Sequence, residues 1–194
     1  QAVRNAIDSE IAEVKTKRQI KRLTKSLREQ IETESELIIL LKDKLKTLSD
    51  WKNDLQKEIN AIIREIDKGH GCIATGSHSG QQHAGHYFSV GANSTLRFHL
   101  ENIWLQSMHS NSWKGGDTIR YQEGIIALYG KGYLDYLNSL QSIKPLQLTK
   151  SDIEEKIPIA RGILKWLKLQ NRKFTNEERL SLRIEFNKKL QIYG

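Results

Sequence analysis

The sequence is 194 residues long, 38% hydrophobic and 28% charged, with a formal net charge of +8 and a pI near 9.5. This composition can build a modest core, which excludes a fully disordered chain; the single cysteine excludes an intramolecular disulfide, and the longest apolar run, Leu37–Leu41, is too short to cross a bilayer. We therefore expect a cytoplasmic protein without a membrane segment, and the positive charge favours a polyanionic partner such as nucleic acid.

The first segment, residues 1–68, has the pattern of long helices. It contains neither Gly nor Pro, and apolar residues recur every three or four positions. The spacing changes between Ile31 and Leu37, and a cap at Ser49–Asp50 can begin a new helix, so we expect two or three helices. Their apolar face needs a partner, which is either another part of the chain in a helical hairpin or a second chain in a coiled coil.

A basic run in this segment gives way to an acidic one. Its members are Lys15, Lys17, Arg18, Lys21, Arg22, Lys25 and Arg28, followed by Glu29, Glu32, Glu34 and Glu36. On a helix the basic run is either a solvated face or a contact with a DNA backbone. For the second interpretation we select Lys21, Arg22 and Lys25 as DNA contacts.

The helical pattern stops at residues 69–71, and the composition changes to that of loops and short strands. Gly, Ser, Asn and His are frequent as far as Gly116. The β-branched and aromatic residues in 86–90 and 94–100 predict two short strands joined by a turn at 91–93.

A helix is expected next, over residues 117–130. Asp117 has the position of an N-cap and Gly130 that of a C-terminal stop. Two strands followed by a helix form a small ββα unit, which we assign to residues 69–140, after the long helices of 1–68.

Three polar residues of this unit have the order that a one-metal hydrolytic centre requires. His86 ends the first predicted strand, Asn102 follows the second, and Asn111 precedes the helix. A divalent ion could stabilise charge on a phosphodiester while His86 takes a proton from the attacking water. Asn102 would orient this histidine or brace the loop between the strands. Asn111 would offer a carbonyl oxygen, which suits Mg²⁺.

Five short motifs in this region also carry a family resemblance. In chain order they are CIATG, HAGHY, LRFHLENIWLQS, SNSWKGG and YQEGIIALYG. Together they resemble the successive motifs of the lambda NinG (Rap) recombination endonucleases, a family with an HNH-like core that cuts branched DNA such as Holliday junctions and D-loops. The resemblance extends from Trp51 to about Leu140, with a weaker similarity in the last helix.

This resemblance implies an α+β, mostly helical protein with a ββα-metal unit of the HNH (His-Me finger) type. It implies a metal-dependent endonuclease that uses Mg²⁺ or Mn²⁺ on branched double-stranded DNA, in the cytoplasm of a bacterial or phage-infected cell. His86 matches the histidine of the family's AGHY motif, Asn102 the Asn of its RF…NI motif, and Asn111 the Asn after its second cysteine pair. A homodimer is expected because symmetric cuts across a junction need two centres.

The sequence departs from the family at the cysteine pairs that hold a structural zinc. The four positions read Cys72, Thr75, Ser107 and Ser110. Hydroxyls are poor zinc ligands, so a tetrahedral four-cysteine site cannot form. We predict no structural zinc here, with hydrogen bonds and the packing of Ile73, Leu105 and Met108 holding the loops instead. An alternative zinc site would combine Cys72 with His70, His78 or His109.

Three further departures lie near the proposed centre. His83 stands where the family usually has Asp, Trp104 where it has His, and Gln122 where it has Arg. His83 is either a metal ligand, which would shift the preference from Mg²⁺ towards Mn²⁺, or a partly exposed loop residue. Two cations, Arg97 and Lys114, either clamp a phosphate beside the scissile bond or are ordinary surface charges.

The last segment, residues 141–194, carries +6 of the net charge. We expect two or three helices, with N-caps at Thr149 or Ser151 and at Thr175, where Glu178 completes a capping box. Its basic residues are expected to form a platform for DNA backbone without base specificity. The candidates are Lys165, Lys168, Arg172, Lys173, Arg179 and Arg183, with Lys188 and Lys189 beside them.

Two functional hypotheses follow. The first is a metal-dependent endonuclease for branched DNA, of the Holliday junction resolvase type. The second is a protein of the same fold that binds branched DNA but does not cut it, because its centre is altered. A coiled-coil scaffold without affinity for DNA is a third possibility, and a steep fall of DNA binding with salt would argue against it.

Overall fold

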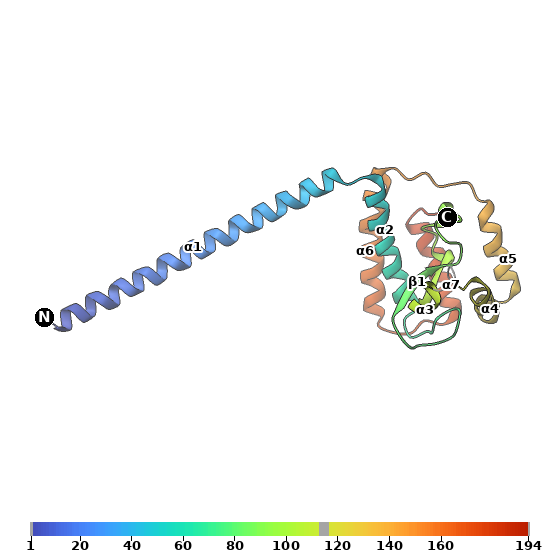
Figure 1. Cartoon of the computed structure of the whole chain (residues 1–194), viewed down its shortest axis with the longest axis horizontal. Coiled ribbons are helices and arrows are strands. Elements are labelled where there is room, and N and C mark those ends of the chain that lie inside the picture. The colour runs from blue at the N-terminus through green and yellow to red at the C-terminus, as the bar shows by residue number, and fades with distance from the viewer. Residues whose placement is uncertain (1, 113–116, 194) are drawn as a thin grey trace. The chain divides into compact units, whose positions relative to one another are not determined.

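The computed structural model in Figure 1 describes residues 2–112 and 117–193, with side chains described over 16–111 and 117–193. The chain divides into two units, residues 1–47 and 48–194. The first unit is a single helix, α1 (Ala2–Leu45). It continues through residues 31–37, where we expected a break, because backbone hydrogen bonds propagate a helix whatever the position of its apolar residues.

The second unit is built on helices from both ends of its sequence. α2 (Leu48–Ile66) lies beside α6 (Lys150–Gln170), and α7 (Asn176–Lys189) completes the group. The predicted caps at Thr149 and Thr175 are confirmed, and each forms a capping box with the residue three positions later. The buried side chains of α2 repeat at helical spacing and pack in one core with those of α6 and α7.

A two-stranded antiparallel sheet lies against these helices. β1 (Gln82–His86) pairs with β2 (Ile103–Ser107). The strands predicted at 86–90 and 94–100 are wrong: apart from His86 these residues form a loop with short 3-10 turns at Ser94–Leu96 and Leu100–Asn102. Their aromatic and aliphatic residues, including Tyr87, Leu96 and Phe98, are buried by tertiary packing instead of strand pairing.

The sheet separates two cores. One face carries Ala84 and Ile103 and packs on the α2 core; the other carries Trp104. This second face is covered by α4 (Thr118–Tyr129) and α5 (Lys131–Ser139), and the helix predicted over 117–130 is confirmed. Two short elements complete the fold, α3 (Met108–Ser112) after β2 and a 3-10 turn at Leu140–Ser142 after α5.

A buried ion cluster ties α2, β2 and α7 together. Asp67, just after α2, is 0% exposed and accepts hydrogen bonds of 2.8 Å from Arg179 Nε, from Arg183 Nη2 and from the backbone N–H of Leu105. The Arg183 guanidinium also lies 3.7 Å from the ring centroid of Trp104. The expectation that Arg179 and Arg183 present a basic surface is therefore wrong, because both side chains are inside the fold.

The expected three-part division differs from the two units of the structure. Boundaries after residues 68 and 140 would cut through the second unit, where α2 and α6 pack together across about a hundred residues of chain. None of the helices within the described residues has the length and apolar character needed to span a bilayer.

Candidate functional site

The site is built on the hairpin formed by β1 and β2 and on the short helix that follows it. His86 lies opposite Ile103 at one end of the hairpin, and Gln82 opposite Ser107 at the other. Side chains alternate between the two faces of a strand, so His83 and Gly85 share one face while Ala84 and His86 share the other.

A polar groove of about 580 Å³ runs along β1, between α2 and α3. Both proposed metal ligands, His83 and Asn111, line it. The structure therefore brings together two residues that are 28 positions apart. The other lining side chains are Asn60 and Arg64 from α2, and Gln81, Gln82 and Ala84 from the hairpin.

Because Gly85 has no side chain, two amide oxygens can lie close to the backbone of β1 beside this groove. A Cβ atom at Gly85 would lie 2.1 Å from Gln106 Oε1 and 3.0 Å from Asn111 Oδ1. Only glycine allows these oxygens to approach the strand so closely. Sequence reasoning passed over Gly85, Gln106 and Arg64; the glycine inside a strand is a signal that could have indicated the close approach.

The proposed base, His86, lies outside the groove lining, and its side chain is on the face of β1 opposite that of His83. Its Nε2 is 2.8 Å from the carbonyl oxygen of Arg97. A carbonyl oxygen only accepts, so Nε2 carries the proton and Nδ1 of the neutral ring is left as an acceptor. Burial lowers the pKa of His86 below its ordinary value, which keeps the ring neutral near pH 7.

Asn102 braces the loop between the strands. Its Oδ1 accepts from the backbone N–H of Phe88 at 2.8 Å, and its Nδ2 donates to the carbonyls of Phe88 at 3.0 Å and Leu96 at 3.1 Å. The side chain is 1% exposed. These bonds are those of a bracing residue, one of the two roles expected for Asn102, and they hold the segment that carries the Arg97 carbonyl near His86.

Comparison with known proteins identifies the family of this chain. The family described as "Bacteriophage Lambda NinG protein" matches residues 2–184. The chain belongs to the NinG family. The NinG protein of Escherichia phage lambda is 32% identical over 119 residues, which cover 58% of each chain.

Two further NinG relatives match over a shorter stretch. The proteins of Enterobacteria phage H19B and Salmonella phage P22 are each 36% identical over 96 residues, covering 49% of this chain and 48% and 47% of theirs. The chain thus spans about half the length of the curated relatives it matches. No solved structure matches it.

Cys72, Thr75, Ser107 and Ser110, at which the resemblance led us to expect cysteine pairs, are joined by hydrogen bonds. The first two are in the loop before β1; Ser107 ends β2 and Ser110 lies in α3. Ser107 Oγ is 3.1 Å from Ser110 Oγ and accepts from the Ser110 backbone N–H at 3.2 Å. Burial raises the pKa of the Cys72 thiol, but hydrogen bonds from Thr75 and Ser107 outweigh it, so the pKa is lowered overall.

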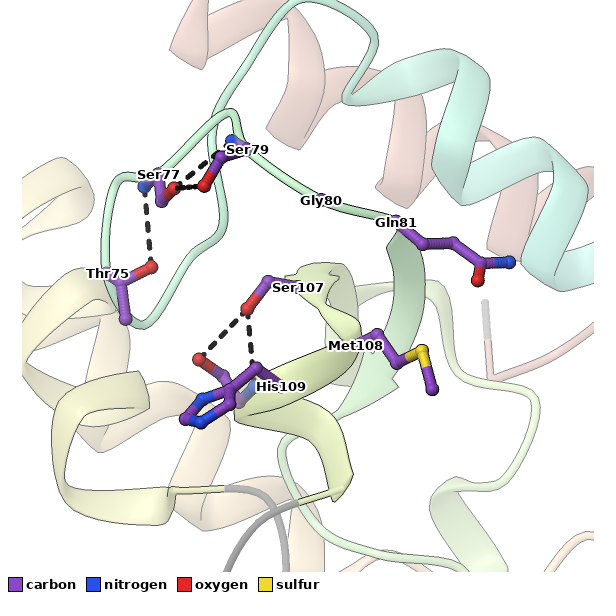
Figure 2. Close-up of a pocket in the computed structure, with 9 residues that line it drawn as sticks. Thr75, Ser77, Ser79, Gly80, Gln81, Ser107, Met108 and His109 are labelled. Carbon is purple, nitrogen blue, oxygen red and sulfur yellow. Dashed lines mark hydrogen bonds between the residues drawn. The ribbon is translucent and has the colours of Figure 1, made fainter.

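Figure 2 shows Thr75 and Ser107 across the adjoining pocket, which measures about 710 Å³. Further hydroxyl bonds join Ser77 and Ser79, with 2.7 Å between their oxygens, in the same loop. The expected packing is found at Ile73 and Leu105, which are buried, but not at Met108, which is 50% exposed.

The predicted DNA contacts have different environments. Arg97 donates to Asn53 Oδ1 at 2.7 Å and to Gln56 Oε1 at 3.4 Å, both on α2. Arg172 is exposed but forms a two-bond ion pair with Glu178, at 2.7 and 2.9 Å. Lys114 lies outside the described residues. The remaining candidates are exposed: Lys165, Lys168 and Lys173 in the second unit, and Lys21, Arg22 and Lys25 on α1.

The other histidines are not placed in the groove lining. His78 and His109 are exposed, while His70 is half-buried with Nε2 2.8 Å from the Phe174 carbonyl oxygen. Within the described residues, no three or more His, Cys, Asp or Glu side chains are grouped so that they could hold a metal ion.

The neutral groups that line the groove are the imidazole of His83 and the amides of Asn111, Asn60, Gln81 and Gln82, and the two proposed ligands, His83 and Asn111, are among them. Protein-bound Mg²⁺ relies on carboxylates and substrate phosphates, and an imidazole ligand favours Mn²⁺. Arg64 lines the same groove and would attract a phosphate. These residues therefore fit a divalent ion that is bound together with a DNA phosphate, not one held by the protein alone.

Proposed function

We propose that this NinG chain is a structure-selective endonuclease that cuts branched recombination intermediates, such as Holliday junctions or D-loops, by metal-assisted phosphodiester hydrolysis. The supporting observation is the shared groove, which His83, Asn111 and the cation of Arg64 all line. The family resemblance supplies the substrate class. Two copies would be needed for symmetric cuts across a junction.

In the proposed mechanism, Arg64 would attract the scissile phosphate into the groove, and Asn111 and His83 would hold a divalent ion there. When bound, the ion would stabilise the charge that develops on the phosphodiester and on the leaving 3′ oxygen. The family resemblance implies His86 as the base, with Nδ1 as the proton acceptor. Its ring lies outside the groove lining and on the face of β1 opposite His83, so the attacking water would have to reach the phosphate from outside the groove. The lowered pKa of His86 suits the role of a base, since the ring stays neutral and can accept a proton even when the pH falls to the ordinary pKa of histidine.

A labelled four-way junction incubated with Mg²⁺ or Mn²⁺ tests this proposal. We expect nicking by the unchanged protein, and a loss of about 100-fold or more in His86→Ala and Asn111→Ala. His78→Ala is the matched control, because His78 is an exposed loop histidine away from the groove. Full activity in His86→Ala together with loss in His83→Ala would overturn the assignment of His86 as the base.

The second candidate is a protein that binds branched DNA without cutting it. Among the described lining residues of the groove there is no carboxylate, and this observation favours the alternative. Binding of the junction by the unchanged protein without nicking, with either ion, would overturn the nuclease proposal and leave this one. The binding should weaken steeply with salt if exposed lysines contact phosphates.

A further inference from the structure

Helix α1 carries an apolar row along one face. Five of its side chains, at positions 20, 27, 31, 38 and 45, fall within about 40° of one another around the helix axis. They are 50–81% exposed, and α1 is the only helix or strand among the described residues of the first unit, so no other element of that unit covers them. The five are Ile20, Leu27, Ile31, Ile38 and Leu45. An exposed row of this length is the feature of a helix that pairs with another helix.

The same helix carries two adjoining blocks of opposite charge. Residues 17–28 contain six Lys or Arg and no acidic residue, and residues 29–36 contain four Glu and no basic residue. Two such helices side by side and in parallel would place the basic blocks against each other and the acidic blocks against each other. In the antiparallel orientation each basic block lies beside an acidic block.

The apolar row is symmetric about a point near residue 29, which is also where the basic and acidic blocks meet. In an antiparallel pair centred there, Ile20 of one copy faces Ile38 of the other, and Leu27 faces Ile31. Glu32 then lies beside Lys25 of the second copy, one helical turn from the centre. The same centre therefore satisfies both the apolar contacts and the charges.

We propose that α1 pairs with α1 of a second copy of this chain as an antiparallel two-helix coiled coil centred near residue 29. We infer that a second copy of the chain covers the exposed row, because α1 carries both a basic and an acidic block. When one copy is antiparallel to the other, each basic block lies beside an acidic block. The pairing is independent of the nuclease proposal, since none of the groove residues lies on α1.

Light scattering on the full chain without DNA tests the pairing. The expected mass is twice the 22.4 kDa of one chain. Leu27→Asp should give the mass of one chain, whereas Leu40→Asp should not, because Leu40 is 59% exposed on the opposite side of the helix. A one-chain mass for the unchanged protein, or a two-chain mass for Leu27→Asp, would overturn the proposal.

Disulfide formation tests the orientation. In the antiparallel pair, position 24 of one copy lies about one residue from position 35 of the other, whereas equal positions are separated by about 15 Å or more. A disulfide needs Cα atoms roughly 4.4–6.8 Å apart. We therefore expect cross-linking in a mixture of Thr24→Cys and Ser35→Cys, and in neither variant alone. The unchanged protein is the control, because its Cys72 is 1% exposed.

Salt gives a third readout. Screening of exposed charges should weaken an antiparallel pair, so its dissociation constant should rise with ionic strength. A parallel pair would strengthen, because its like charges would be screened. Cross-linking of either cysteine variant alone, or a dimer that tightens with salt, would overturn the antiparallel orientation.

Discussion

The substitution Asp67→Asn should destabilise the second unit strongly. It removes the carboxylate from a cluster in which Arg179 and Arg183 are 2% and 0% exposed. Asparagine keeps one accepting oxygen but replaces the other with an amide NH2 that can only donate, and it removes the carboxylate charge that pairs with two buried guanidinium groups. Breaking a buried ion pair in this way costs about 3–5 kcal/mol. This is a large fraction of the roughly 5–15 kcal/mol that stabilises a folded domain.

Urea unfolding at pH 7, followed by circular dichroism and by tryptophan fluorescence, measures this loss. Trp104 is one of the four tryptophans that contribute to the fluorescence, and the Arg183 guanidinium lies against its ring. Asp54→Asn is the matched control: Asp54 pairs with Lys57 at 2.8 Å on the surface of α2, where such pairs contribute at most about 1 kcal/mol. A loss below about 1 kcal/mol in Asp67→Asn would refute the argument that this carboxylate neutralises the buried arginines.

Three other predictions concern the same unit. A triple variant that restores the cysteine pairs should bind about one zinc per chain, measured by metal analysis. Its substitutions are Thr75→Cys, Ser107→Cys and Ser110→Cys. Gly124→Ala should lower the urea midpoint, because its Cβ would lie 1.8 Å from the Ile73 carbonyl oxygen, whereas Gly132→Ala has open space and should stabilise α5 by about 0.5–1 kcal/mol. Burial lowers the pKa of His99 to about 4, so the free energy of unfolding should fall by about 3 kcal/mol as the pH drops from 6.5 to 4.

The sign of the His99 effect follows from its protonation in the two states. Above pH 6.5 the ring is neutral in both the folded and the unfolded protein. Below this pH only the unfolded protein takes up the proton, so stability decreases. In His99→Gln this part of the pH dependence should vanish. If the stability of His99→Gln falls with acid as much as that of the unchanged protein, the His99 prediction is wrong. A triple cysteine variant that binds no zinc would contradict the zinc prediction. Equal urea midpoints for Gly124→Ala and Gly132→Ala would contradict the glycine prediction.

Most helices could be predicted from the sequence, because capping residues and apolar spacing act between residues that are close together in the chain. Thr175 and Glu178 lie three residues apart and form the capping box that their types predict. Asp117 and Gly130 bound α4 at the expected positions, although the Asp117 side chain forms no capping hydrogen bond. The new helix expected at Ser49–Asp50 is found, since α2 begins at Leu48, but the break expected between Ile31 and Leu37 is absent, because a change in apolar spacing does not interrupt backbone hydrogen bonds.

The strands were misplaced because pairing is not local. Residues 82–86 have little β propensity and form a strand only because residues 103–107 lie beside them. The aromatic stretch that resembled a strand is buried in loops, where Asn102 satisfies the backbone groups of Phe88. Tertiary packing therefore decided which residues of this region pair.

Within the candidate site, residue types pointed to His83 and Asn111, and the fold decided that they share a groove with Arg64. In the same fold Arg179 and Arg183 are buried, where both pair with the carboxylate of Asp67. The sequence did not indicate this pairing, because Asp67 is more than a hundred positions away in the chain. The sequence by itself determined where the helical segments at both ends of the chain and α4 lie, the family motifs and the charge blocks of α1. Only the tertiary structure decided which charges are buried and which polar groups meet, because both depend on contacts between residues far apart in the sequence.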